Sequence, residues 1–371
     1  MKIGSISEEL TSEKRISLTP ELSKKYLDLD IEIFINKNYG IHLGFYDNDY
    51  KEKGVQILED VNEVINNSNS LLQVNLPHTN YITKLKENTS LIGIFNPYGN
   101  KEKINLLLKK KINIFSLDLL PRIAKAQLMD VLSSQANLAG YKAVIESFNE
   151  FEKVIPMMMT AAGTIPAAKV LVIGAGVAGL QAIATAKRLG AIVFATDVRQ
   201  ASKEQVESLG GKFLSVEGAE DLETKEGYAK ETSEDFKLKQ KKLLSDTLKK
   251  MDIVICTALI PGKKAPRIIN EEMFKGIQAG TVVFDLAVEQ GGNSAYSEID
   301  KIVNKDGIKI IGYKNILNKL PLSATKLYSK NLYNFFFNLY DKKKKNLNVN
   351  LKDEIINKTF VQNKNTYIYG N

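Results

Sequence analysis

Short apolar runs alternate with amphipathic stretches along the chain. In its first third, runs rich in Ile, Leu and Phe predict strands, at residues 1–6, 31–36, 71–76, 91–96 and 112–117. Residues 20–29 and 101–111 lie between such runs and have the pattern of amphipathic helices. This alternation of strand and helix predicts a parallel sheet that helices cover on both faces.

A second series of the same kind fills most of the remaining chain. A long helical pattern at about 131–151 leads into it, and its strands are predicted at 169–174, 191–197, 211–216, 252–259, 281–287 and 308–313. The charged segment 223–246 is typical of a surface excursion that leads into a solvated helix. Residues 322–340 predict one more amphipathic helix.

These patterns predict an α/β fold with two Rossmann-like domains that have parallel sheets, are joined by long helices and enclose a cleft. A chain of 371 residues exceeds the size of one compact core. We expect residues 1–130 with 320–371 to form the first domain, which a C-terminal helix completes, and residues 131–319 to form the second. A cleft between two such domains is the expected place for a ligand.

One apolar stretch, residues 154–186, has Lys169 as its only charge and could be mistaken for a membrane span. Prolines and glycines interrupt it, and a lipid-exposed helix broken in this way would leave backbone groups unsatisfied. We therefore predict a buried strand followed by a buried helix, and no transmembrane segment. The single cysteine, Cys256, lies in an apolar run; it allows no internal disulfide and fits a reducing compartment.

Composition narrows the class of partner. The net charge of +8 comes from scattered lysines, and aromatic residues are not interleaved with basic clusters, so the sequence argues against DNA or RNA binding. The first residues lack the apolar core of a secretory signal. The run Lys342–Lys345 is interpreted as a solvated terminus, with docking to acidic lipid or to a partner as the alternative.

Residues 169–197 carry the clearest chemical signature. Gly174, Gly176 and Gly179 have G-x-G-x-x-G spacing, follow an apolar strand and open a helix, and the next strand ends at Asp197. Such glycines allow a tight turn, close approach of a pyrophosphate and close packing of the helix, whose N-terminus presents N–H groups to phosphates. Asp197 at the strand end favours NAD over NADP, whereas Arg199 argues the other way. A glycine-rich turn without a ligand is the alternative.

Polar residues also recur in the stretch 121–141. Arg122, Gln127, Asp130 and Ser133 stand at offsets of five, three and three among apolar and small residues. Asp130 is placed to cap the helix that follows, and small residues such as Gly140 allow another helix to pack closely against it. A cap does not explain Arg122 and Gln127, so loop decoration and a binding site both stay open.

Several longer motifs occur in one order: EKRISLTPE at 13–21, MDVLSSQANLAGYKAV at 129–144, IGAGVAGLQAIATAKRLGA at 173–191, TALIPGKKAP at 257–266 and FDLAVEQGGN at 284–293. On these motifs the chain resembles the NAD(H)-binding first domain of proton-translocating NAD(P) transhydrogenase. The resemblance runs from Met1 to at least Tyr340. Alanine dehydrogenases share this fold and several of the motifs.

The resemblance implies NAD(H) on this chain and hydride transfer between NADH and NADP⁺ that a partner subunit binds. It implies that Arg122, Gln127 and Asp130, with Ser133, surround the nicotinamide end and serve as the catalytic residues. The second domain is implied to hold the rest of the dinucleotide, through Gly174, Gly176, Val177, Ala178, Gly179, Asp197, Val198, Arg199, Gly227, Tyr228, Gln240 and Leu259. No metal is expected.

The resemblance also implies an assembly. We expect a homodimer that works with a membrane-spanning subunit and an NADP(H)-binding subunit, at the cytoplasmic face of the inner membrane, with hydride transfer coupled to proton movement. The chain is similar to the split form of the enzyme, in which this domain is a separate subunit that cannot pump protons alone.

A stand-alone alanine dehydrogenase-like amino-acid dehydrogenase is the main alternative. In that group an arginine, a lysine and a histidine grip and activate the substrate; here they correspond to Arg15, Asn75 and Asn96. Amino-acid oxidation needs an acid/base group, and asparagine cannot provide one. Hydride transfer between two nicotinamides moves no proton in that step, so it tolerates both asparagines. A non-catalytic NAD-binding regulatory protein is a further alternative.

Overall fold

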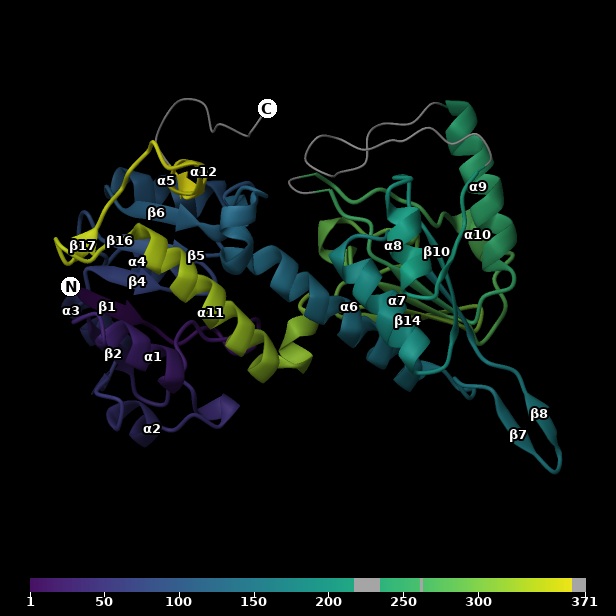
Figure 1. Cartoon of the computed structure of the whole chain (residues 1–371), viewed down its shortest axis with the longest axis horizontal. Coiled ribbons are helices and arrows are strands. Elements are labelled where there is room, and N and C mark those ends of the chain that lie inside the picture. Colours follow the sequence, from purple (N-terminus) through teal and green to yellow (C-terminus); the bar gives the residue numbers. More distant parts are fainter. Residues whose placement is uncertain (217–233, 261–262, 362–371) are drawn as a thin grey trace. The chain divides into compact units, whose positions relative to one another are not determined.

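The chain folds into two compact units. A computed structural model describes residues 1–216, 234–260 and 263–361 (Figure 1). Unit 1 comprises Met1–Gln135 and Leu317–Asn371, and unit 2 comprises Ala136–Ile316. The helix α6 (Val131–Glu150) begins in unit 1 and continues into unit 2.

Unit 1 is built on a seven-stranded sheet with the order β18-β6-β5-β4-β1-β2-β3. Its strands are β1 (Lys2–Ser5), β2 (Glu32–Asn36), β3 (Gln56–Leu58), β4 (Ser70–Leu72), β5 (Ser90–Gly93), β6 (Asn113–Ser116) and β18 (Phe360–Val361). All neighbours pair in parallel except β18, which runs antiparallel to β6. This is the doubly wound order, in which the direction of winding reverses between β1 and β4.

Helices cover both faces of this sheet and enclose a buried apolar cluster on each. They are α1 (Pro20–Leu27), α2 (Asp47–Lys51), α3 (Val61–Asn67), α4 (Thr79–Ile82), α5 (Lys101–Lys109), α11 (Pro321–Leu339) and α12 (Glu354–Thr359), with short turns η1 (Ile41–Leu43), η2 (Leu117–Leu119), η3 (Ala124–Met129) and η5 (Ile316–Lys319). From α11, Tyr328, Leu332, Phe335 and Phe336 are fully buried in one cluster. The C-terminal amphipathic helix predicted from the sequence therefore packs in unit 1.

Unit 2 has a second seven-stranded sheet, with the order β11-β10-β9-β12-β13-β15-β14. Its strands are β9 (Lys169–Ile173), β10 (Ile192–Thr196), β11 (Lys212–Phe213), β12 (Ile253–Cys256), β13 (Val282–Asp285), β14 (Lys301–Lys305) and β15 (Ile308–Gly312). Among these strands, β14 alone is antiparallel to its neighbour. The direction of winding reverses between β9 and β12, which gives unit 2 a Rossmann-like order as well.

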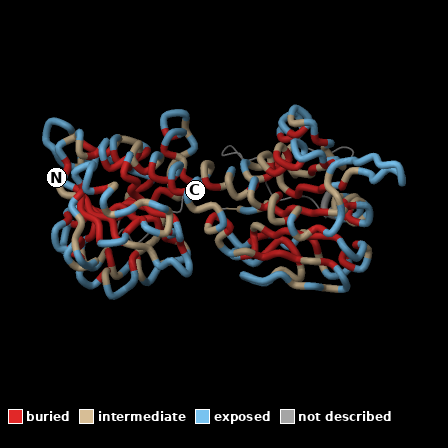
Figure 2. Tube along the Cα trace, turned by 90° about the horizontal axis from the view of Figure 1, so that it is seen from below, coloured by how far each residue is buried: buried red, intermediate tan, exposed pale blue. Residues whose placement is uncertain are grey.

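The helices of unit 2 also lie on both faces of its sheet. They are α7 (Val177–Arg188), α8 (Ser202–Ser208), α9 (Glu234–Leu248) and α10 (Glu271–Phe274), with the turn η4 (Val288–Gln290). A Cβ atom on Gly140 of α6 would lie 2.0 Å from the carbonyl oxygen of Ala178, so glycine there allows α6 and α7 to touch. Cys256 is fully buried in β12, as the apolar run around it predicted. Figure 2 shows buried residues in red along the strands of each unit, with exposed ones in the loops.

Two expectations were wrong. Residues 169–188 form the predicted buried strand and helix, but the residues just before them form a hairpin, β7 (Met158–Thr160) with β8 (Gly163–Ile165), in which every residue from 156 to 166 is exposed. This hairpin projects from the rest of unit 2 (Figure 1). The run Lys342–Lys345 is not a terminus: it forms the turn between β16 (Tyr340–Asp341) and β17 (Asn346–Leu347), where Lys345 pairs with Asp30.

No helix in the described ranges is both long enough and apolar enough to span a membrane.

Candidate functional site

The glycine-rich turn follows β9 at the point where the winding of unit 2 reverses. Gly174 has φ +94°, a backbone conformation that favours glycine, and its carbonyl accepts a hydrogen bond from Thr257 Oγ1 at 2.9 Å. A Cβ on Gly179 would lie 1.9 Å from the carbonyl oxygen of Gly174, which explains how the helix can approach the turn. Around a Cβ on Gly176, no atom of the described residues lies within 4 Å. The middle glycine therefore borders open space.

That open space lies at the start of α7. Gly176 is the N-cap residue and offers no capping side chain, and its carbonyl accepts from the Leu180 amide at 2.8 Å. The first N–H groups of a helix have no partner within it, and the helix dipole gives this end a partial positive charge. Val177, the first helical residue, is 40% exposed. An anionic group fits this position by space, by hydrogen-bond donors and by charge.

Asp197 follows β10 and lies beside the same turn. Its carboxylate accepts from the Ala175 amide at 2.7 Å and from the Arg199 amide at 2.9 Å. The Arg199 guanidinium grips it at both oxygens, with Nε at 2.9 Å from Oδ1 and Nη2 at 2.8 Å from Oδ2. Burial alone would raise the pKa of Asp197, but these hydrogen bonds outweigh it and hold the pKa below its usual value. The carboxylate is ionised, and its charge is partly balanced by Arg199.

Other residues predicted to contact a cofactor are spread over unit 2. Val198 lies between Asp197 and Arg199; Leu259, after β12, is 39% exposed; Gln240 is half-buried on α9. Gly227 and Tyr228 lie outside the described residues.

The polar residues of the stretch 121–141 lie around the turn η3 in unit 1. Asp130 caps α6, as predicted: its Oδ1 accepts from the Ser133 amide at 2.9 Å, and its Oδ2 accepts from Ser133 Oγ at 2.6 Å. Arg122 and Gln127 are exposed. Within the described part of the chain, the Gln127 side chain makes no hydrogen bond. A polar side chain held on an ordered turn without an internal partner is available to a ligand.

A buried polar cluster occupies the carboxyl ends of β1 and β4, where the winding of unit 1 reverses. Arg15 and Glu13 form a two-fold ion pair, Nε to Oε1 at 2.8 Å and Nη2 to Oε2 at 2.7 Å, and both side chains are buried. Arg15 Nη1 also donates to Gln135 Oε1 at 3.0 Å, and Asn75 Nδ2 donates to Glu13 Oε2 at 3.2 Å. Burial by itself would raise the pKa of Glu13, but its hydrogen bonds with Arg15 prevail and keep that pKa below its ordinary value.

Glu8 adds a second carboxyl group to this cluster. Its Oε1 accepts from the Val74 amide at 2.7 Å and from Gln73 Nε2 at 3.2 Å. Burial of the carboxyl group, with a smaller contribution from the negative charge of Glu13, raises the pKa of Glu8 to about 8 despite the amide of Val74. Open α/β sheets bind ligands at this kind of reversal. In unit 1, side chains of the chain itself satisfy one another there.

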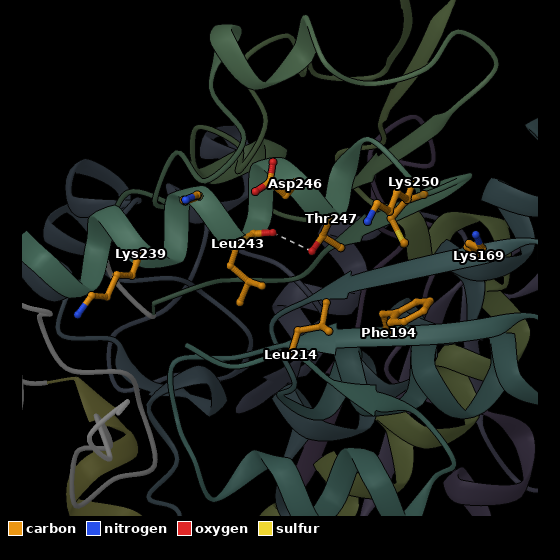
Figure 3. Close-up of a pocket in the computed structure, with 10 residues that line it drawn as sticks. Lys169, Phe194, Leu214, Lys239, Leu243, Asp246, Thr247 and Lys250 are labelled. Carbon is orange, nitrogen blue, oxygen red and sulfur yellow. Dashed lines mark hydrogen bonds between the residues drawn. The ribbon is translucent and has the colours of Figure 1, made fainter. Parts of the chain in front are cut away.

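A hollow of about 540 Å³ opens beside α9 in unit 2 (Figure 3). Its floor is apolar and its rim carries lysines; it is lined by Lys169, Phe194, Leu214, Lys239, Lys242, Leu243, Asp246, Thr247, Lys250 and Met251. Among the described residues, none of those predicted to bind a cofactor lines it. The glycine turn and this hollow are separate features of unit 2.

Comparison with known proteins places the chain in a family. The family descriptions "Alanine dehydrogenase/PNT, N-terminal domain" and "Alanine dehydrogenase/PNT, C-terminal domain" match residues 4–139 and 143–369. The chain belongs to the alanine dehydrogenase/PNT family.

Within this family the chain is a relative of transhydrogenase alpha subunits. The first part of the NAD(P) transhydrogenase alpha subunit of Rhodospirillum rubrum is 45% identical over 368 residues, which cover 97% of this chain and 96% of the relative. The solved structure of a transhydrogenase from Sinorhizobium meliloti is 40% identical, with a TM-score of 0.88 and 98% of each chain covered. A structure titled L-alanine dehydrogenase, with a TM-score of 0.81, covers 98% of this chain and 95% of its own, but its 20% identity shows the shared fold alone.

Sequence reasoning identified Arg15 in this family member but missed what holds it. Glu13 stands two positions before Arg15 in an extended segment, which puts both side chains on one side of the backbone; this spacing was the available signal. Gln135 and Glu8 carried no such signal, because they reach the cluster from 120 residues later and from the turn after β1. Asn96, the counterpart of the family histidine, is exposed at φ +41°, and its Oδ1 accepts from the Gly99 amide.

Proposed function

We propose that this chain is the NAD(H)-binding subunit of a proton-translocating NAD(P) transhydrogenase, Re/Si-specific as in the enzyme it resembles. It transfers hydride between NADH and NADP⁺ that a partner subunit binds. High identity to a relative with that name supports the assignment over almost the whole chain. The observation that carries it against an amino-acid dehydrogenase is the buried Arg15–Glu13 pair.

A dehydrogenase of this family would need Arg15 for the substrate carboxylate. Here Glu13 supplies a carboxylate from within the chain, bound by two hydrogen bonds and buried with its partner. Displacing a buried ion-pair partner leaves an unpaired buried charge, which costs about 3–5 kcal/mol. Asn75 and Asn96 supply no acid/base group. Both facts disfavour substrate binding and proton transfer in unit 1.

For the cofactor, we propose that unit 2 holds the dinucleotide along its glycine turn. Gly174, Gly176 and Gly179 shape the turn, and the first N–H groups of α7, at Val177 and Ala178, receive the pyrophosphate. Asp197 accepts from the adenosine ribose, and Val198, Arg199, Gln240 and Leu259 flank it. Gly227 and Tyr228 are proposed as further contacts.

At the other end, Arg122, Gln127, Asp130 and Ser133 are proposed to hold the carboxamide and the ribose of the nicotinamide. The bound nicotinamide supplies the hydride from its C4 position. These residues have to orient the ring and exclude water; no proton has to move in that step. NADP(H) is proposed to bind on a partner subunit.

We also propose a homodimer, which the hairpin β7–β8 supports. Residues 156–166 carry no charge, and Met157, Met158, Met159 and Ile165 are 61%, 44%, 77% and 42% exposed. A projecting apolar hairpin of this kind marks an interaction site on a monomer. A membrane-spanning subunit is the other proposed partner; it places this chain at the cytoplasmic face of the inner membrane and couples hydride transfer to proton movement.

The test is reconstitution. The purified chain is mixed with an NADP(H)-binding transhydrogenase domain, and reduction of NADP⁺ by NADH is followed spectroscopically. We expect hydride transfer only in the mixture, and no NADH oxidation with pyruvate and ammonia. Robust alanine dehydrogenase activity would refute the proposal, and binding of NADH without transfer to any partner domain would favour a regulatory role.

A further inference from the structure

The backbone of the turn η3 is fastened to α11 through one carbonyl group. The carbonyl oxygen of Leu128 accepts from Asn331 Nδ2 at 2.8 Å and from Asn334 Nδ2 at 2.9 Å. A carbonyl oxygen has two lone pairs, so these amides satisfy both. Leu128 directly follows Gln127, which means that the fastening acts one residue from the side chain proposed to hold the nicotinamide.

Asn331 holds the other side of Asp130 as well. Its Oδ1 accepts from Ser134 Oγ at 2.7 Å, and the Ser134 amide donates to the Asp130 carbonyl at 3.2 Å. One asparagine side chain thus bridges the turn η3 and the first turn of α6. Asp130 lies between the two points of attachment.

The helix that carries these asparagines is a rigid support. Leu332 and Phe335, the residues that follow Asn331 and Asn334, are fully buried in the core of unit 1. Asn331 and Asn334 are three positions apart, so both side chains leave α11 on one face. The turn itself buries only Ala126 and Met129, while Leu128 is 70% exposed. Little apolar surface of the turn is buried, and the two amides supply specific attachment.

We propose that Asn331 and Asn334 are positioning residues that fix the segment 122–130 for hydride transfer. The inference rests on the proposed function. The asparagines contact backbone and Ser134, not the reacting atoms, so their removal changes the geometry of Gln127 and Asp130 rather than the chemistry available. Binding of the dinucleotide, most of which we assign to unit 2, should persist.

A first experiment measures the fastening without any activity. Hydrogen exchange of the peptide covering residues 124–130 is compared in wild type, the double variant Asn331→Ala/Asn334→Ala, and Asn338→Ala. Asn338 is the matched control: it is also on α11, one turn further along, and its buried Nδ2 makes no hydrogen bond in the described part of the chain. We expect exchange about tenfold faster in the double variant and unchanged exchange in the control.

A second experiment measures the consequence in the reconstituted reaction. In the double variant we expect kcat to fall about 10- to 100-fold while the Kd for NADH stays within about threefold, since misplacement of about 1 Å can cost 10²-fold in rate. Asn334→Asp is isosteric but sets a carboxylate oxygen against the Leu128 carbonyl, so it should be slower than Asn334→Ala. Alanine favours helix more than asparagine does, which keeps α11 folded in these variants.

Unchanged exchange in the double variant would overturn the proposal, and so would equal losses of kcat and NADH affinity. A wild-type chain that binds NADH but never transfers hydride would instead refute the proposed function, and the exchange experiment would still decide whether the asparagines fix the segment.

Discussion

Gly176 and Gly179 belong to one motif but meet different surroundings. We expect Gly179→Ala to destabilise the fold by about 2–3 kcal/mol, because its Cβ would lie 1.9 Å from a backbone carbonyl oxygen. Gly176→Ala meets open space, so it should fold normally yet weaken NADH binding about tenfold or more by occupying the proposed pyrophosphate position. Thermal unfolding and NADH titration of the two variants check this, and a Gly176→Ala chain with intact affinity would contradict the proposed site.

Gln127 offers a test of positioning against anchoring. Shortening it by one methylene in Gln127→Asn should leave the Kd for NADH within about threefold and slow hydride transfer by about 10-fold or more, because the side chain no longer reaches the same place. The measurement is single-turnover transfer to an NADP(H)-binding domain alongside NADH titration. Equal losses in binding and rate would mean that Gln127 only anchors the nucleotide.

Glu8 makes unit 1 sensitive to pH. Its folded pKa of about 8 lies above the ordinary 4.5, so the folded chain holds this proton more tightly than the unfolded chain. The resulting stability is fully present below pH 4.5 and is lost as the pH rises through 8. Between pH 5 and 8 we expect the wild type to lose on the order of 2 kcal/mol, or about 5 °C in Tm, relative to Glu8→Gln.

Thermal unfolding across this pH range measures the difference. The exposed neighbour Glu9 provides the control, since Glu9→Gln should keep the wild-type pH profile. Parallel profiles for wild type and Glu8→Gln would show that Glu8 is ionised throughout the range, and the buried cluster would then need another source of compensating charge.

At the scale of elements, the hairpin β7–β8 is the feature whose role the monomer does not explain. If a second copy covers it, a charge at Met159, which is 77% exposed, should break the dimer. We expect Met159→Glu to weaken dimerisation about 100-fold or more, since an unpaired charge would be buried in an apolar interface. Leu351→Glu, at a 44% exposed apolar position of unit 1, is the matched control. Sedimentation velocity reads the result, and a Met159→Glu chain that remains dimeric would exclude the hairpin from the interface.

At the scale of the whole molecule, cofactor binding should appear as stability. A ligand that binds only the folded chain stabilises it by about 2.7 kcal/mol at 100 times its Kd. We expect NADH to raise the Tm of the chain and NADPH to raise it far less, because the ionised Asp197 disfavours a 2′-phosphate. Differential scanning calorimetry with each nucleotide tests this; equal shifts would indicate that Arg199, paired with Asp197, accommodates the phosphate.

Much of the molecule followed from sequence pattern. Apolar runs of four or more residues are buried on both sides in a parallel sheet, so β1, β2, β9, β12 and β13 could be found from the runs alone. The strands β3, β14 and β18 were missed because they are short or lie at sheet edges, where burial imposes little pattern. The hairpin β7–β8 was mistaken for buried structure, since apolar residues that face solvent or a partner look the same in sequence as those of a core.

By itself, the sequence determined the alternating α/β order, the glycine turn after β9 and the cap at Asp130, because each depends on residues near one another along the chain. Only the tertiary structure showed that Glu13 and Gln135 occupy Arg15, and that two asparagines of α11 hold the Leu128 carbonyl. These contacts join residues as many as 206 positions apart. Hydrogen bonds of that kind depend on where the sheet and helices place side chains in space, and no local pattern records them.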